Sequence, residues 1–71
     1  MFISNKEKEG RTIGSRLQLI RDVEVLKGTF AAGSILEVIG ESDSRGEFEC
    51  RDLDSGETVY LHPLLTHYKK V

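Results

Sequence analysis

The chain has 71 residues, which allows one small domain and leaves little room for a deep catalytic cavity within a single subunit. Its 10 basic and 12 acidic residues give a net charge of -2, which disfavours sequence-independent nucleic-acid binding because such binding normally needs a basic excess. A single cysteine excludes an intrachain disulfide, and neither a signal peptide nor a membrane-length apolar run is recognisable, so we expect a cytoplasmic protein.

Residues 1–15 form a polar arm of mixed charge, with glycines at positions 10 and 14. Such a composition is typical of a solvated, partly disordered segment. The alternative is that Phe2 and Ile3 add a short strand or make an oligomer contact. We therefore place the globular domain at residues 16–71, and we expect a homodimer or larger assembly in which the arm docks on a strand edge.

Apolar and polar side chains alternate from residue 16 to residue 26, which predicts a strand with one buried face. The phase breaks between Leu19 and Val23, which predicts a bulge or bend near residues 20–21. The following "KGTFAAG" has two glycines around a short apolar tip and is typical of a loop. Phe30 in this loop is either an exposed binding anchor or a cap on the core, and a core this small favours the cap.

Three more strands are predicted by alternation at residues 34–39, 47–53 and 57–62. The side chains expected to face the core are Phe48, Cys50, Val59 and Leu61. In the strand at 34–39, Leu36 and Val38 share one face, and Ile35, Glu37 and Ile39 share the other. Turn-forming residues fill 42–46, and "DSG" predicts a tight hairpin in which Asp54 bonds its own downstream backbone and Gly56 adopts positive φ.

Pro63 cannot donate to a sheet and ends the fourth strand. "PLLT" has the length of one 3₁₀ turn, and "HYKKV" predicts a short fifth strand. This order resembles an SH3-like barrel over about residues 16–71. We therefore expect a mostly β fold, a small five-stranded SH3-like barrel with a 3₁₀ turn before the last strand, and Leu64 or Leu65 as the plug of its open end.

Two families with such barrels bear comparison. "VEVLKGTFAAGSILEVIGE" resembles the KOW-type barrel of transcription and translation proteins, which implies a nucleic-acid-associated function. "VYLHPLL" resembles the end of the type II dihydrofolate reductases, small barrels that catalyse as tetramers with a glutamine on the strand before the proline. Tyr60 stands at the matching position and no glutamine is near it, so that activity is not carried over.

Cys50, His62 and His67 lack the paired, close spacing of zinc ligands, and the strand phase turns Cys50 inward, which favours a core thiol. Neither a phosphate-binding glycine loop nor a nucleophile–base arrangement is recognisable, so we expect no catalytic residue, no cofactor and no metal.

Charged residues gather in two regions. Carboxylates surround the "DSG" hairpin, at Glu47, Glu49, Asp52, Asp54 and Glu57. They form either a solvated edge that resists aggregation or an acidic face for a basic partner. A basic patch that would contact nucleic acid includes Lys6, Lys8, Arg11, Arg16, Arg21, Lys69 and Lys70. Tyr68, beside the last two, would add an aromatic ring for stacking.

The leading interpretation is a non-enzymatic protein-interaction module, of a size that suits a bacterial or phage accessory protein. Loops converging at one end of the barrel would form its partner-binding face, with Phe30, Arg45, Tyr60, His62 and Tyr68. The alternatives are a nucleic-acid-associated KOW-like barrel and an oligomeric enzyme with a site between subunits. No membrane partner is expected.

Overall fold

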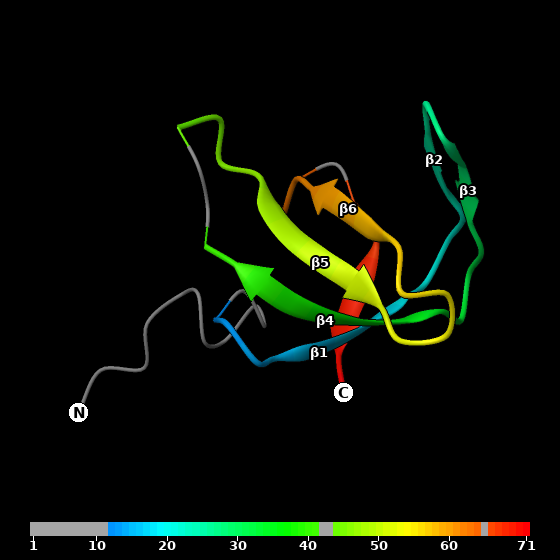
Figure 1. The fold of residues 1–71 in the computed structure, drawn as a ribbon, viewed down its shortest axis with the longest axis horizontal. Coiled ribbons are helices and arrows are strands. Elements are labelled where there is room, and N and C mark those ends of the chain that lie inside the picture. The colour runs from blue at the N-terminus through cyan, green and yellow to red at the C-terminus, as the bar shows by residue number, and fades with distance from the viewer. Residues whose placement is uncertain (1–11, 42–43, 65) are drawn as a thin grey trace.

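The computed structural model describes residues 12–41, 44–64 and 66–71. Within these ranges the fold is mostly β, as expected, with seven strands and no helix, and hence none long and apolar enough to cross a bilayer (Figure 1). The strands are β1 (Arg16–Leu19), β2 (Val23–Val25), β3 (Gly28–Phe30), β4 (Ile35–Gly40), β5 (Phe48–Asp52), β6 (Thr58–Leu61) and β7 (Tyr68–Lys70).

The strands form two sheets rather than the closed five-stranded barrel that was expected. Five strands pair in the order β6-β5-β4-β1-β7, while β2 and β3 form a separate hairpin. All pairs are antiparallel, and the last strand returns to the first, with Tyr68 opposite Leu19. Figure 1 shows the β2–β3 hairpin standing beside the larger sheet, with β2 on the side towards β6.

The single strand expected over residues 16–26 is divided between the two sheets. β1 ends at Leu19, and the N–H of Ile20 then donates to the carbonyl of His67 at 2.8 Å. The chain enters β2 at Val23, after Asp22 has accepted a hydrogen bond at Oδ1 from the N–H of Ala32 at 2.8 Å. The bend predicted at residues 20–21 is therefore confirmed, and it marks a passage from one sheet to the other and not a bulge within one strand.

The "KGTFAAG" segment is also more ordered than a loop. Gly28–Phe30 is strand β3, and Phe30 lies opposite Val23. The Phe30 side chain is only 7% exposed and belongs to the core, so the cap interpretation is confirmed and the exposed-anchor interpretation is wrong. The local composition did not indicate this strand because the strand is stabilised by pairing with β2. Local residue preferences do not report such pairing.

The core is built mainly from the inward side chains of the five-stranded sheet, and the β2–β3 hairpin adds Phe30 to it. The four side chains expected to face inward, in β5 and β6, are all buried, and on β4 the buried face is that of Leu36 and Val38. They are joined by Leu17 and Leu19 of β1 and by Phe30, while Val23, Val25 and Tyr68 pack against them. Strict period-two alternation made these positions predictable because it puts every second side chain on one face.

The β5–β6 hairpin is confirmed, but a different residue stabilises its turn. Gly56 has a φ of 77°, as predicted. The carboxylate that accepts hydrogen bonds within the turn belongs to Asp52. Its Oδ1 accepts the N–H of Asp54 at 2.8 Å and the N–H of Ser55 at 3.3 Å. Asp52 is 8% exposed, and these two bonds satisfy a carboxylate that would otherwise be costly to bury.

The expected 3₁₀ turn after β6 is not confirmed by the described residues. The N–H of Thr66 donates to the carbonyl of His62 at 3.0 Å, a bond that spans four residues where a 3₁₀ turn spans three. Leu64 is 86% exposed and therefore does not plug the core, while residue 65 lies outside the described residues.

Most of the N-terminal arm, residues 1–11, lies outside the described ranges as well. Sheet pairing nevertheless starts before residue 16. The N–H of Gly14 donates to the carbonyl of Val38, and the N–H of Val38 donates to the carbonyl of Ser15, both at 2.8 Å.

Candidate functional site: a cleft between the two sheets

A cleft of about 350 Å³ lies between the hairpin and the five-stranded sheet. Residues 22–25 form its hairpin wall. Tyr60 and His62, from β6 and the residue after it, form the facing wall, with Glu47, Thr66 and His67 completing the lining. Segments distant in sequence meet here because β1 passes the chain to the hairpin while β7 returns to β1.

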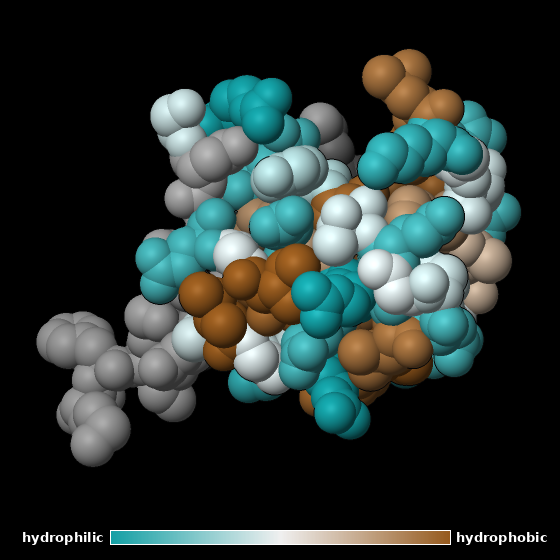
Figure 2. Space-filling model, in the orientation of Figure 1, coloured by the Kyte–Doolittle hydropathy of each residue, from teal (hydrophilic) through white to brown (hydrophobic). Residues whose placement is uncertain are grey.

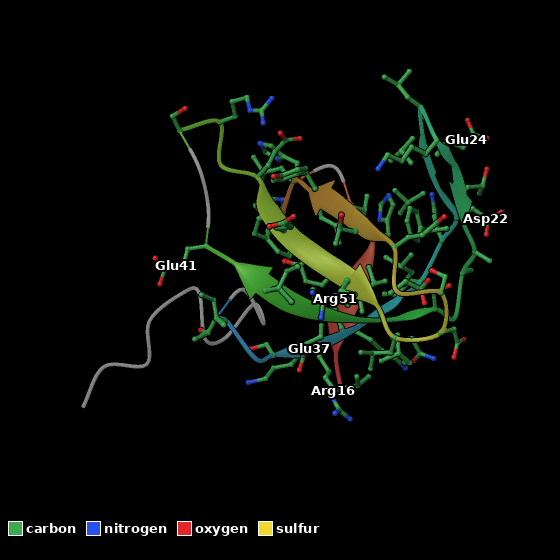
Figure 3. All side chains as sticks on the ribbon, in the orientation of Figure 1. Arg16, Asp22, Glu24, Glu37, Glu41 and Arg51 are labelled. Atoms are coloured by element: carbon green, nitrogen blue, oxygen red, sulfur yellow. The ribbon has the colours of Figure 1, made fainter. Side chains whose placement is uncertain are left out.

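The hairpin wall has an apolar inner side and a charged outer side. Val23 and Val25 are half-buried and pack against the core, while Glu24 between them is exposed. The hydrogen bond from Ala32 to Asp22 fixes the base of the hairpin. Figure 3 shows Asp22 and Glu24 on the hairpin, apart from the other labelled residues.

The facing wall presents an aromatic ring and an oriented imidazole. Tyr60 is 53% exposed because the alternation of β6 turns it away from the core. The Nδ1 atom of His62 accepts the N–H of Leu64 at 3.1 Å, so in the neutral ring the proton resides on Nε2. A Cβ at Gly46 would lie 3.7 Å from that Nε2, which places the imidazole against the segment leading to Glu47.

Among the described residues that border the cleft, Asp22, Glu24 and Glu47 are acidic and none is a lysine or arginine. The side chain of Glu24 lies on the outer side of the hairpin, so Asp22 and Glu47 are the two acidic side chains that can face a ligand in the cleft. Glu47 is oriented by Arg45, whose Nη2 lies 3.3 Å from Glu47 Oε1. Carboxylates beside an aromatic face favour a cation, by charge-assisted hydrogen bonds and by the attraction of the ring face.

The five residues expected to share one partner-binding face are not all together. Tyr60 and His62 line the cleft, and Arg45 adjoins it through Glu47. Phe30 is buried in the core. Tyr68 turns inward, where its ring meets that of Phe48 edge to face with centroids 5.8 Å apart.

The sequence interpretation missed the hairpin wall. Alternation alone predicts that residues 22–25 continue the strand of Leu17 and Leu19, with Asp22 and Glu24 on an ordinary solvated face. The break in alternation before Val23 was the available signal, since a new phase allows a separate hairpin with its own neighbours.

Cys50 is a buried core thiol, as expected. Burial raises its pKa from 9.0 to about 12, and the negative charge of Glu49 contributes in the same direction. No group of three or more His, Cys, Asp or Glu side chains suited to a metal occurs among the residues that the structure describes.

The expected basic region is not one continuous patch within the described ranges. Arg16 lies opposite Glu37, and Glu37 lies opposite Arg51, so charges of opposite sign alternate across β1, β4 and β5 (Figure 3). Figure 2 shows hydrophilic side chains spread over this side of the molecule between separate hydrophobic patches. Lys6, Lys8 and Arg11 lie outside the described residues.

Comparison of the chain with protein-family models, with curated proteins and with solved structures gave no match. Its own geometry therefore carries the functional argument.

Proposed function

We propose that this protein is a non-enzymatic, SH3-like interaction module that binds an extended, positively charged segment of another protein in the cleft between β2 and β6. The observation that carries the proposal is the convergence of Tyr60, His62, Asp22 and Glu47 on one cleft of about 350 Å³. Binding sites of small ligands and side chains are concave, with a few polar groups that select the ligand.

The strand order supports the SH3-like class. The last strand lies beside the first, and β4, β5 and β6 follow as a meander on the other side of β1. The β2–β3 hairpin is inserted between β1 and β4, at the position of the first large loop of that fold. The β2 strand of this insertion borders the cleft.

Charge complementarity supports a cationic ligand. An arginine or lysine side chain entering the cleft would meet the carboxylates of Asp22 and Glu47 and the ring of Tyr60. The same carboxylates would repel a phosphate backbone, so the alternative of a KOW-like nucleic-acid-associated barrel would require another face of the molecule. We place this activity in the cytoplasm, where the sole cysteine would stay reduced.

A titration with defined peptides tests the proposal. The probes are three extended peptides, alike except that two positions carry arginine, citrulline or glutamate. With ¹⁵N-labelled protein, the arginine peptide should shift the amide signals of residues 22–25, Tyr60 and His62. It should bind about tenfold more tightly than the citrulline peptide, because charge-assisted hydrogen bonds are about twice as strong as neutral ones.

Matched variants locate the effect. Glu47→Gln and Tyr60→Leu should each weaken the arginine peptide about three- to tenfold, whereas Glu57→Gln, at an exposed carboxylate that does not line the cleft, should leave binding unchanged. Absence of cleft shifts with all three peptides would overturn the proposal. Salt-dependent binding of a single-stranded oligonucleotide in place of the peptides would favour the nucleic-acid alternative.

A further inference from the structure

We propose that the bound segment is an added β-strand, which pairs its backbone with the open edge of β6 and lies between β6 and β2. This inference rests on the proposed function and specifies how the partner is held. It commits to a segment of a partner protein that is extended and carries lysine or arginine at alternate positions. The main chain would supply affinity, and the alternate side chains would supply selectivity.

The first observation is the free edge of β6. This strand is the last in its sheet and pairs with β5 alone among the described strands. The N–H of Asp52 donates to the carbonyl of Glu57 at 2.8 Å, which sets the phase of the β5–β6 pair. Bonded positions alternate along an antiparallel pair, so Thr58 and Tyr60 direct their N–H and C=O groups away from β5.

The second observation is the manner in which β2 borders the cleft. Asp22 and the three residues of β2 all border the cleft. β2 pairs with β3 alone among the described strands, so its other edge is open to a further strand.

The third observation is the asymmetry between the two ends of the five-stranded sheet. The β7 edge carries Lys69 and Lys70 in a strand of three residues, and lysines are a common means of keeping an edge from pairing. β6 reads "TVYL" and contains neither a lysine nor a proline. Pro63 comes only after the strand has ended. The edge that borders the cleft is the edge without this protection.

The charge of the cleft selects the occupant. An added strand would alternate its side chains, so that one set lies beside Tyr60 and the carboxylates of Asp22 and Glu47. Basic residues in that set would neutralise the acidic lining. A second copy of this chain is the competing occupant, and the test below separates the two.

Hydrogen exchange of individual amides tests the pairing directly. The probe is the arginine peptide of the preceding section, added at saturation to the full chain. The amide protons of Thr58 and Tyr60 should exchange quickly in the free protein and about tenfold or more slowly in the complex. Those of Val59 and Leu61, already paired with β5, serve as the internal control and should change little.

Backbone methylation of the probe supplies a test that leaves the protein untouched. Two versions of the peptide carry N-methyl groups on complementary alternate residues. One version removes the donors that face β6 and should bind about tenfold or more weakly, while the other should retain more of the affinity. Thr58→Pro removes one outward donor at an edge position and should reduce binding, provided that its amide spectrum shows the native fold.

The outcomes are distinguishable from those of the proposed function. Peptide shifts in the cleft with unchanged exchange at Thr58 and Tyr60, and equal affinity of the two methylated peptides, would overturn strand addition while leaving the interaction module in place. Protection of Thr58 and Tyr60 without peptide, rising with protein concentration together with the mass from light scattering, would identify a second copy as the occupant and overturn the proposal.

Discussion

Gly40 and Glu49 lie opposite each other on β4 and β5, and the side chain of Glu49 covers the position where Gly40 has no Cβ. A Cβ built at Gly40 would lie 3.1 Å from Glu49 Cβ and 3.2 Å from its Oε1. Ordinary cross-strand pairs keep their Cβ atoms about 4.5–5.5 Å apart. The register shift between Val38 and Gly40 creates this close approach, so the glycine is required for space and not for an unusual φ.

Gly40→Ala should therefore destabilise the fold by about 1–3 kcal/mol, the usual cost of overpacking, although Gly→Ala at an unobstructed site often stabilises. In a Glu49→Gly background the added methyl group has room, and most of this cost should disappear. Urea unfolding of the four proteins of this double-mutant cycle measures the coupling. Equal costs in both backgrounds would show that Glu49 is not the obstacle.

Asp52→Ala should cost about 1–3 kcal/mol of unfolding free energy, because it leaves the turn N–H groups of Asp54 and Ser55 without their acceptor. Asp52→Asn keeps an oxygen in place and should lose less. Asp54→Ala is the control: Asp54 is exposed, and its change should stay within about 0.5 kcal/mol. Denaturant unfolding measures the stability loss of the three variants. A larger loss for Asp54→Ala than for Asp52→Ala would show that Asp54, and not Asp52, stabilises the turn.

Cys50 should be unreactive in the folded protein. A pKa of about 12 leaves only roughly one thiol in ten thousand ionised at pH 8, and the thiol is buried as well. Iodoacetamide at pH 8 should modify the protein in urea and leave the native protein unmodified for hours. Native labelling at the rate of the unfolded chain would contradict this.

The same pKa shift gives a pH dependence of stability. The folded-state pKa of Cys50 is raised above the unfolded value, so the stabilising contribution of the neutral thiol is fully present below about pH 9 and is lost as the pH rises towards 12. Cys50→Ala should be less stable at neutral pH because it leaves a cavity, yet its stability should decline less between pH 9 and pH 11. Parallel slopes for the two proteins over this interval would exclude Cys50 as the titrating group.

The two faces of β6 should respond differently to truncation. Leu61 and Val59 are buried, at 1% and 5% exposure, so their replacement by alanine should cost about 2–4 kcal/mol, with Val59 at the low end. Thr58→Ala and Tyr60→Ala should cost less because these side chains face outward. Thermal or urea unfolding measures the loss of stability for each variant. Equal losses on the two faces of β6 would mean that an assembly buries the outer face.

Self-association is a separate prediction. Phe2 and Ile3 are an isolated apolar pair, and we expect them to hold a homodimer or larger assembly. Deleting residues 1–12 should lower the mass seen by light scattering and leave the β fold intact, because the sheet pairing described begins at Gly14. A full-length protein that stays monomeric at high concentration would reject the assembly. An unfolded truncation would show that the deleted segment belongs to the core.

The sequence by itself determined the inward faces of β5 and β6, the β5–β6 hairpin and the buried state of Cys50. Each of these depends on neighbours along the chain: the alternation of Phe48 and Cys50 puts both on one face, and Gly56 permits the φ that the turn needs. Alternation also identified Tyr60 and His62 as outward-facing, which is how they entered the candidate site.

Only the tertiary structure decided where the phase break before Val23 leads. The same local pattern is compatible with a bulge in one strand or with a passage to a second sheet. The choice depends on the pairing of β2 with β3 and of β1 with β7, contacts between segments that are distant in sequence. That choice brought residues 22–25 to the cleft that Tyr60 also lines, and it buried Phe30. Local preferences set which side of a strand is apolar, whereas the site required the positions of strands relative to one another.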